Sequence, residues 1–257
     1  MTPINLEPLL RRHRHALEAC GDDRAFLTAY RGLIADVAAL VEIDDDQLER
    51  AIDVHAGFFR SMQQRYLAVE ERDAAEGLLT SSSTTTHADG RAWTAFADEA
   101  YRRVADLEQV GSFGDFRRVV AAGSGALPST LLWMADHFPG ASYVGLDVDE
   151  RCIDVASRVA KQLELTNVTF VQTDAAAYDY AGVDFVFVAN QVRPKVGVLE
   201  RIAATIGHPV TVVVREPTAV GRLFAEPVDV LPPGYRVEHV GDASRAFLSR
   251  DVFFTLG

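Results

Sequence analysis

The sequence contains little cysteine and no metal-binding pattern. It has 2 cysteines in 257 residues, Cys20 and Cys152, and neither stands in a Cys-x-x-Cys or a mixed Cys/His spacing. We therefore expect neither a disulfide framework nor a structural zinc site. The scarcity of cysteine instead favours a reducing, cytoplasmic location. No two of the 7 histidines have the His-x-x-x-His spacing that places two metal ligands on one face of a helix. We therefore predict no metal site.

Basic charge and long apolar runs are scarce as well. The 25 Lys and Arg residues face 37 Asp and Glu residues, which gives a formal net charge of −12. An acidic surface repels phosphate backbones, and nucleic-acid binders carry clustered basic residues. No apolar run reaches the roughly 18 residues that cross a bilayer. We therefore expect a small-molecule substrate, and neither nucleic acid nor a membrane as partner.

Two hydrophobic rhythms divide the chain. From Leu6 to about Glu76, apolar residues recur three and four apart, which predicts amphipathic helices. After Phe116, short valine-rich runs alternate with helical stretches, as in a parallel sheet covered on both faces. These runs are RVVAA, SYVGLDV, VTFVQTD, DFVFVAN and VTVVVRE, followed by YRVEHV and VFFTLG as a predicted antiparallel pair. We predict an N-terminal helical domain over residues 1–112 and a Rossmann-like α/β domain over 113–257.

Three signals at the ends of three consecutive predicted strands indicate an adenosine-type ligand. The first strand runs into the glycine turn GSGALP, residues 123–128, and glycines let a backbone approach a ligand closely. Asp147 ends the second strand, where a carboxylate holds two ribose hydroxyls. Asp174 ends the third strand and can accept a hydrogen bond from an adenine amino group. Pro128 replaces the third glycine of GxGxxG, which favours S-adenosylmethionine over NAD.

The same segments resemble the nicotianamine synthase family. FRRVVAAGSGALPSTLLWMADHFPGASYVGLDVD is similar to its core, which has a GSGPLPLTS-like turn and then a Y-D-I-D-like strand end. AEGLL and AYRRVADLE extend the similarity upstream, so that it covers roughly Ala75 to Gly257. The resemblance implies a class I methyltransferase-like sheet and transfer of the 3-amino-3-carboxypropyl group of S-adenosylmethionine, with release of 5′-methylthioadenosine. A branch of similar enzymes closes that group on its own amine and makes azetidine-2-carboxylate.

The chain departs from the family where an outside amine would be held. Thr80 replaces the last glutamate of AEGLLE, although Glu76 remains. Ala97 and Asp98 replace a pair of tyrosines, and residues 189–193 read ANQVR in place of an apolar A-A-L-V-G. Because these changes leave the adenosyl half intact, we predict a cyclase that needs no acceptor.

Four residues are candidate catalytic groups. Asn190 is predicted to accept a hydrogen bond from the substrate α-amine and so to aim its lone pair at Cγ. Tyr101 either offers its ring to the sulfonium or is a core tyrosine. Glu76 is either a proton acceptor or an exposed helix carboxylate. Tyr178 either flanks the substrate or caps the sheet as a loop aromatic.

The predicted S-adenosylmethionine site gathers the strand ends and their neighbours. Arg215 matches a family arginine and is expected to pair with the substrate carboxylate or with Glu216. The complete predicted set is Gly123, Ser124, Gly125, Ala126, Leu127, Pro128, Asp147, Val148, Asp174, Ala175, Asn190, Gln191 and Arg215.

Three other functions stay open at this point. The first is transfer of the aminocarboxypropyl group to an outside amine, as in metallophore synthesis, which would require that amine. The second is conventional methyl transfer, which would yield S-adenosylhomocysteine. The third is a sensor that holds the nucleotide without turnover. Incubation with S-adenosylmethionine alone separates all three from the cyclase.

Overall fold

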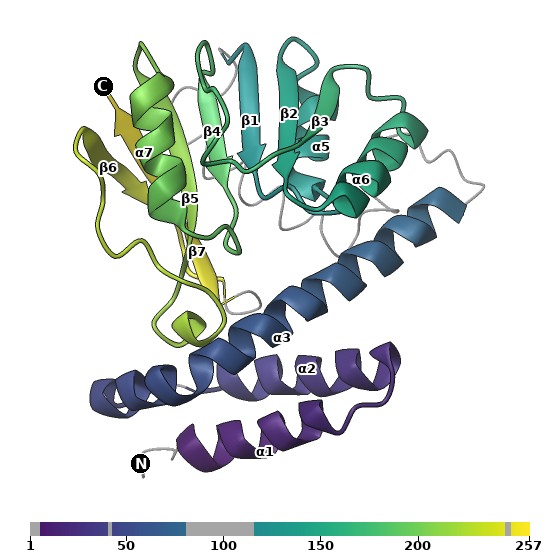
Figure 1. Cartoon of the computed structure of the whole chain (residues 1–257), viewed down its shortest axis with the longest axis vertical. Helices are drawn as coiled ribbons and strands as arrows, with labels where there is room; N and C mark the ends of the chain where they lie inside the picture. Colours follow the sequence, from purple (N-terminus) through teal and green to yellow (C-terminus); the bar gives the residue numbers. More distant parts are fainter. Residues whose placement is uncertain (1–5, 41–42, 81–115, 245–247) are drawn as a thin grey trace. The chain divides into compact units, whose positions relative to one another are not determined.

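The computed structural model describes residues 6–40, 43–80, 116–244 and 248–257 (Figure 1). The chain divides into two compact units. The first comprises Met1–Glu70, Glu216–Pro227 and Asp242–Arg250; the second comprises Glu71–Arg215, Val228–Gly241 and Asp251–Gly257. The predicted domain boundary at residue 112 falls within 81–115, outside the described residues.

The first unit is built on α1 (Leu6–Glu18), α2 (Asp23–Ala38) and the first part of α3 (Asp45–Thr80) (Figure 1). The carboxylate of Asp22 accepts a hydrogen bond from the Ala25 N–H at 2.8 Å and so caps the start of α2. The short 3-10 helix η3 (Val220–Leu223) belongs to the same unit. The predicted N-terminal helices are thus confirmed. They bury a shared apolar core that includes Leu6, Leu10, Phe26, Tyr30, Leu33, Val37, Leu48, Phe59, Leu223, Phe224 and Leu248.

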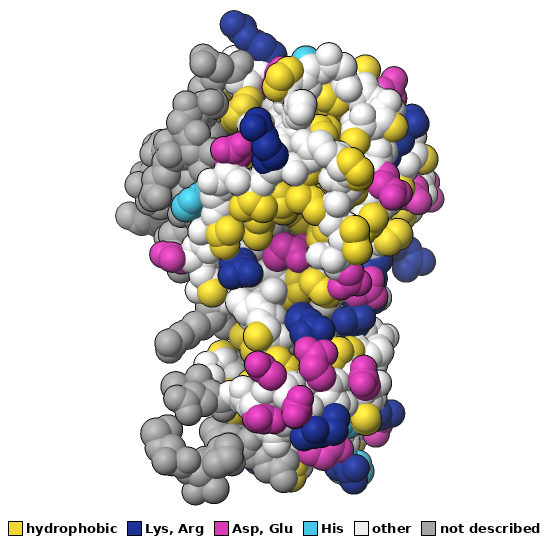
Figure 2. All heavy atoms as spheres, turned by 90° about the vertical axis from the view of Figure 1, so that its left-hand side faces the viewer, with side chains coloured by type: hydrophobic (Ala, Val, Ile, Leu, Met, Phe, Trp, Pro, Cys, Tyr) yellow, Lys and Arg dark blue, Asp and Glu magenta, His cyan; other side chains and the backbone are white. Residues whose placement is uncertain are grey.

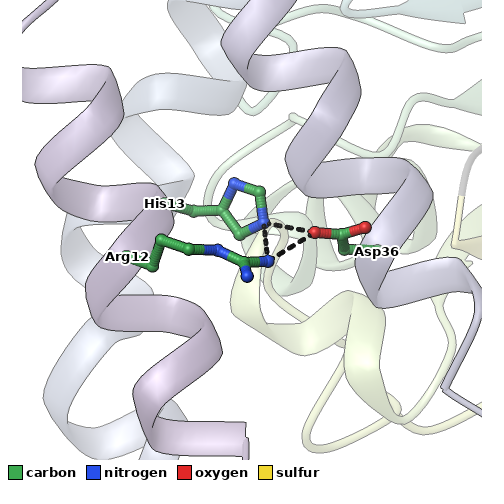
Figure 3. Close-up of polar contacts among 3 residues, drawn as sticks. All are labelled: Arg12, His13 and Asp36. Carbon is green, nitrogen blue, oxygen red and sulfur yellow. Dashed lines mark hydrogen bonds and ion pairs between the residues drawn. The ribbon is translucent and has the colours of Figure 1, made fainter.

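Polar contacts tie the helices of this unit together. In Figure 3, Arg12 and His13 of α1 both point toward Asp36 of α2, with Nη2 and Nε2 at 2.7 and 2.8 Å from the same carboxylate oxygen. His55 of α3 likewise places its Nε2 2.9 Å from Glu7 of α1. These two buried histidines therefore serve packing between helices.

The second unit contains a seven-stranded sheet. Its order is β3-β2-β1-β4-β5-β7-β6, and the first five strands pair in parallel while β6 and β7 are antiparallel. The strand order reverses between β1 and β4, which creates the switch point where open α/β sheets bind ligands. The strands are β1 (Arg118–Ala122), β2 (Ser142–Asp147), β3 (Val168–Gln172), β4 (Phe185–Val188), β5 (Val210–Pro217), β6 (Tyr235–Val240) and β7 (Ser249–Leu256).

Helices cover both faces of this sheet. Along β1, Val119 and Ala121 pack with α5 (Ser129–His137), whereas Val120 and Ala122 pack with α7 (Lys195–Thr205). Because neighbouring strand residues point to opposite faces, the two helices lie on opposite sides of the sheet, as Figure 1 shows. The helix α6 (Glu150–Gln162) packs with α5 and with the last turns of α3. The predicted doubly covered α/β architecture is confirmed.

Figure 2 shows one face of the described residues. On the face drawn in Figure 2, acidic and basic side chains are interspersed rather than gathered into one basic area. None of the described helices is long and apolar enough to cross a membrane.

Candidate functional site

The glycine turn after β1 stands at the switch point of the sheet. Gly123 and Gly125 have φ angles of +74° and +68°, a left-handed conformation that L side chains disfavour. A Cβ on Gly123 would lie 2.6 Å from Val192 Cγ2, and a Cβ on Gly125 would collide with the carboxylate of Glu71. Both the backbone conformation and the close neighbours therefore require glycine at these two positions.

Asp147 is held directly against this turn. Its Oδ2 accepts a hydrogen bond from the Gly125 N–H at 2.9 Å, and its Oδ1 accepts one from the Asp149 N–H at 3.0 Å. A carboxylate has about four acceptor sites, so two remain after these contacts. The next residue, Val148, is an apolar side chain that is 68% exposed. The end of β2 thus presents an oriented acceptor beside an exposed apolar surface.

The end of β3 lies beside the end of β2. The Thr173 N–H donates to the Asp147 carbonyl at 2.9 Å, and Asp174 Oδ1 accepts from the Ala176 N–H at 2.9 Å. Asp174 is exposed while Ala175 is buried. The parallel strands therefore bring the glycine turn, Asp147 and Asp174 to one edge.

A residue that the sequence analysis did not single out, Glu71, also contacts the turn. Its Oε2 accepts a hydrogen bond from the Ala126 N–H at 2.9 Å. Burial raises the pKa of Glu71 to about 7 and the Asp147 charge adds to the rise, while the N–H groups of Ala126 and Leu127 oppose it. Two carboxylates thus bind consecutive N–H groups of one turn, an arrangement that favours a cation nearby.

The sequence does carry a signal for Glu71. Along α3, Ala75, Leu78 and Leu79 follow it by four, seven and eight positions and pack into the apolar cluster against α5 and α6. A helix places such positions on one face. Glu71 is therefore a carboxylate on an apolar stripe, and charged side chains on such a stripe seldom lack a function or a partner.

Glu76 lies on a different face of the same helix. Five residues correspond to about 140° around the axis, at about 100° per residue, and Glu76 is exposed. Its backbone carbonyl accepts a hydrogen bond from the Thr80 hydroxyl at 2.8 Å. The exposed-carboxylate interpretation describes Glu76, and the structure does not bring its side chain to the turn.

Tyr178 is directed to the other end of the sheet. Its hydroxyl is 3.1 Å from Arg118 Nη2, and Arg118 begins β1, about 17 Å before Gly123 along the strand at about 3.3 Å per residue. The ring also makes an edge contact with Tyr180 at 5.1 Å. These contacts favour the sheet-capping alternative for Tyr178 over the catalytic one. Tyr101 lies outside the described residues.

The segment after β4 lies against the same turn from the opposite side. The Ala189 N–H donates to the Ala122 carbonyl at 3.0 Å, and Ala189 and Val192 fill the space where a Cβ on Gly123 would stand. Asn190 and Gln191 stand between these two residues in the sequence, and both are half-buried. Asn190 thus belongs to a segment that packs against the glycine turn.

A buried charge cluster adjoins Asn190. Lys195, which is 3% exposed, places its Nζ 2.8 Å from the Arg215 carbonyl and 3.4 Å from Asn190 Oδ1. Arg215 Nε donates to Asp251 Oδ1 at 3.0 Å, and its guanidinium lies 4.9 Å from the centre of the Phe187 ring. Asp251 is thus an ion-pair partner of Arg215, one that the sequence analysis did not name. Lys195 and Asp251 were not predicted, because lysine and aspartate are rarely buried.

The described part of the chain contains no group of three or more His, Cys, Asp or Glu side chains arranged to hold a metal ion. The site assembled above consists of backbone N–H groups, carboxylates, one amide and the buried cations Lys195 and Arg215. They lie at or beside the carboxyl ends of the parallel strands. Such a set suits a small cationic or zwitterionic ligand.

Comparisons with known proteins identify this fold. A sequence profile described as a methyltransferase domain matches residues 119–206, and no curated protein matches the chain. A mutant of the nicotianamine synthase MtNAS in complex with S-adenosylmethionine has a TM-score of 0.78 at 19% identity, covering 98% of both chains. MtNAS in complex with MTA and tNA has a TM-score of 0.77 at 19% identity, covering 98% of this chain and 97% of that one. The chain therefore has the fold of a nicotianamine synthase, built on a methyltransferase-like Rossmann sheet.

Proposed function

We propose that the chain binds S-adenosylmethionine at the carboxyl ends of β1, β2 and β3. Asp147 would use its two remaining acceptor sites for the ribose hydroxyls, and the exposed Val148 would pack against the adenine. Asp174 would accept a hydrogen bond from the adenine amino group. The observation that carries the proposal is the Asp147 carboxylate fixed by the Gly125 N–H at 2.9 Å, at the switch point of the sheet.

The methionine portion would lie over the turn, between Glu71 and Asn190. The sulfonium and the α-ammonium are positive, and two carboxylates on adjacent N–H groups supply the complementary charge. A guanidinium nitrogen of Arg215, Nη2, is buried with no hydrogen-bond partner among the described residues. It would meet the substrate carboxylate, because buried donors need acceptors.

The reaction we propose is ring closure to azetidine-2-carboxylate. The neutral α-amine attacks Cγ, the N–Cγ bond forms as the Cγ–S bond breaks, and the electron pair leaves on sulfur as 5′-methylthioadenosine. The α-ammonium first loses one proton, so one proton is released for each ring. Sulfonium sulfur is a good leaving group, and the protein contributes mainly by holding nitrogen in line with that bond.

Asn190 would orient the attacking amine. Its carbonyl oxygen has two lone pairs, of which one faces Lys195 at 3.4 Å. The other would accept a hydrogen bond from the substrate amine and direct the nitrogen lone pair toward Cγ. Lys195, Asn190 and Arg215 would thereby act as one unit on the β4 and β5 side of the edge.

The test is an incubation of the purified protein with S-adenosylmethionine and no other substrate. We expect 5′-methylthioadenosine and azetidine-2-carboxylate in equal amounts by mass spectrometry, above the background of heat-inactivated protein. S-Adenosylhomocysteine would instead indicate methyl transfer. Turnover only after an amine is added would indicate aminocarboxypropyl transfer, a second candidate that the shared fold with MtNAS favours.

A further inference from the structure

We propose that Glu71 accepts the proton that the substrate α-ammonium loses before ring closure. This inference rests on the proposed function and adds to it the residue that makes the amine nucleophilic. Its basis is the position of Glu71 on the glycine turn, at which the segment carrying Asn190 also packs.

Glu71 is placed directly on the glycine turn. Glu71 Oε2 is 2.9 Å from the Ala126 nitrogen, and its carboxylate fills the space above Gly125. On the other side of the turn, Val192 fills the space above Gly123. A substrate that spans the turn therefore meets Glu71 at one end and the residues after β4 at the other. A proton acceptor must come within hydrogen-bond distance of its proton in such a pose.

The surroundings of Glu71 are acidic. Among the described residues, Asp147 at the end of β2 and Cys152 of α6 face it, and the pKa of the Cys152 thiol is raised to about 12 by burial and by its acidic neighbours. Burial, reinforced by the Asp147 charge, raises the pKa of the Glu71 carboxyl to about 7. A base of this pKa is ionised in part at neutral pH and takes a proton readily.

If Glu71 had only a structural role, it would serve as a hydrogen-bond acceptor and its basicity would not matter. The Ala126 N–H in the glycine turn needs an acceptor, and a glutamine at position 71 supplies one equally well through its amide oxygen. The substitution Glu71→Gln therefore keeps the hydrogen bond and the side-chain shape while it removes basicity. This makes the variant a selective test of proton transfer.

The experiment compares wild type, Glu71→Gln and the control Asp73→Asn, which removes an exposed carboxylate two residues along the same helix. For each protein, S-adenosylmethionine affinity is measured by calorimetry, and kcat and kcat/KM for 5′-methylthioadenosine release are measured from pH 5.5 to pH 9. We expect Glu71→Gln to lose affinity by about ten-fold at most, because one of two carboxylates beside the substrate cation is neutralised, and to lose about 10²-fold or more in kcat. The control is expected to match wild type.

The pH profile gives the decisive readout. Wild-type kcat/KM should rise with pH as Glu71 of the free enzyme ionises, with an inflection at about pH 7, whereas Glu71→Gln should lack this limb and rise only as the substrate amine deprotonates in solution. A Glu71→Gln variant with kcat within three-fold of wild type and an unchanged profile would overturn the assignment. If wild type itself releases no 5′-methylthioadenosine, the proposed function fails, and the role of Glu71 fails with it.

Discussion

The carboxyl edge of the sheet has two halves that hold their charged side chains in different ways. On the β1 to β3 half, Asp147, Asp174 and Glu71 accept hydrogen bonds from backbone N–H groups. On the β4 and β5 half, Arg215 pairs with Asp251, and Lys195 is buried against the Arg215 carbonyl. Carboxylates held by the backbone keep acceptor sites for a ligand, whereas charges paired with each other are fixed in place. The β1 to β3 half is therefore suited to bind a ligand, and the β4 and β5 half is suited to hold the reacting part of that ligand in position.

The largest expected effect comes from breaking the buried pair on the β4 and β5 half. The side chains of Arg215 and Asp251 are 14% and 8% exposed. Asp251→Ala would leave the guanidinium buried and uncompensated, and we expect the free energy of unfolding in urea to fall by about 3 kcal/mol. The double variant Arg215→Ala/Asp251→Ala should lose less than the sum of the single losses. A loss below about 1 kcal/mol for Asp251→Ala would contradict the claim that this half is held by buried charges.

Removing the charge of Glu71 is expected to change the free energy of unfolding by a comparable amount, but to raise it rather than lower it. The pKa of Glu71 is about 7 in the folded protein against an ordinary 4.5, so its stabilising contribution is full below pH 4.5 and is lost as the pH rises through 7. Glu71→Gln should therefore be more stable than wild type at pH 8, by up to about 3 kcal/mol at about 1.4 kcal/mol per pKa unit. The two proteins should converge near pH 4.5. Equal stability of the two proteins at pH 8 would show that burial does not disfavour the ionised form of Glu71.

The third effect concerns ligand affinity. Asp147→Asn keeps the shape of the side chain but removes a charged acceptor from two proposed ribose hydrogen bonds. We expect the Kd for S-adenosylmethionine, measured by calorimetry, to rise roughly 10- to 100-fold. The matched control is Asp154→Asn, an exposed aspartate on α6, which should bind as wild type does. An unchanged Kd in Asp147→Asn would remove the adenosyl site from this half of the edge.

The smallest effect is expected at Asp174. This aspartate is exposed and is proposed to make one hydrogen bond to the adenine amino group. Asp174→Asn should therefore raise the Kd only about three- to five-fold. Competition with inosine-containing and adenosine-containing analogues would sharpen this result, because the variant should discriminate less between them. A loss as large as that of Asp147→Asn would give Asp174 a role beyond this contact.

The difference between the two halves also explains which parts of the site the sequence predicts. Gly123, Gly125 and Asp147 follow directly after short apolar runs, and parallel strands bring their carboxyl ends to one edge, so local spacing is sufficient to place them together. The same reasoning recovered the five parallel strands and the final antiparallel pair.

The remaining residues depend on contacts between distant segments. Glu71 reaches the turn because α3 packs against α5 and α6, which no spacing within residues 123–128 indicates. Tyr178 lies in a loop that returns to the amino end of the sheet, so its closeness to Asp174 in sequence was misleading. Lys195 is buried against the usual preference of lysine for solvent, and its partner Arg215 is 20 residues away.

The most direct test of the central claim follows the bond that ring closure creates. S-Adenosylmethionine carrying nitrogen-15 in the α-amine and carbon-13 at Cγ is incubated with the protein, and the products are examined by NMR. The account predicts an azetidine-2-carboxylate whose labelled nitrogen and carbon are directly coupled, in an amount equal to 5′-methylthioadenosine. Labelled S-adenosylhomocysteine, or intact S-adenosylmethionine bound without turnover, would contradict it.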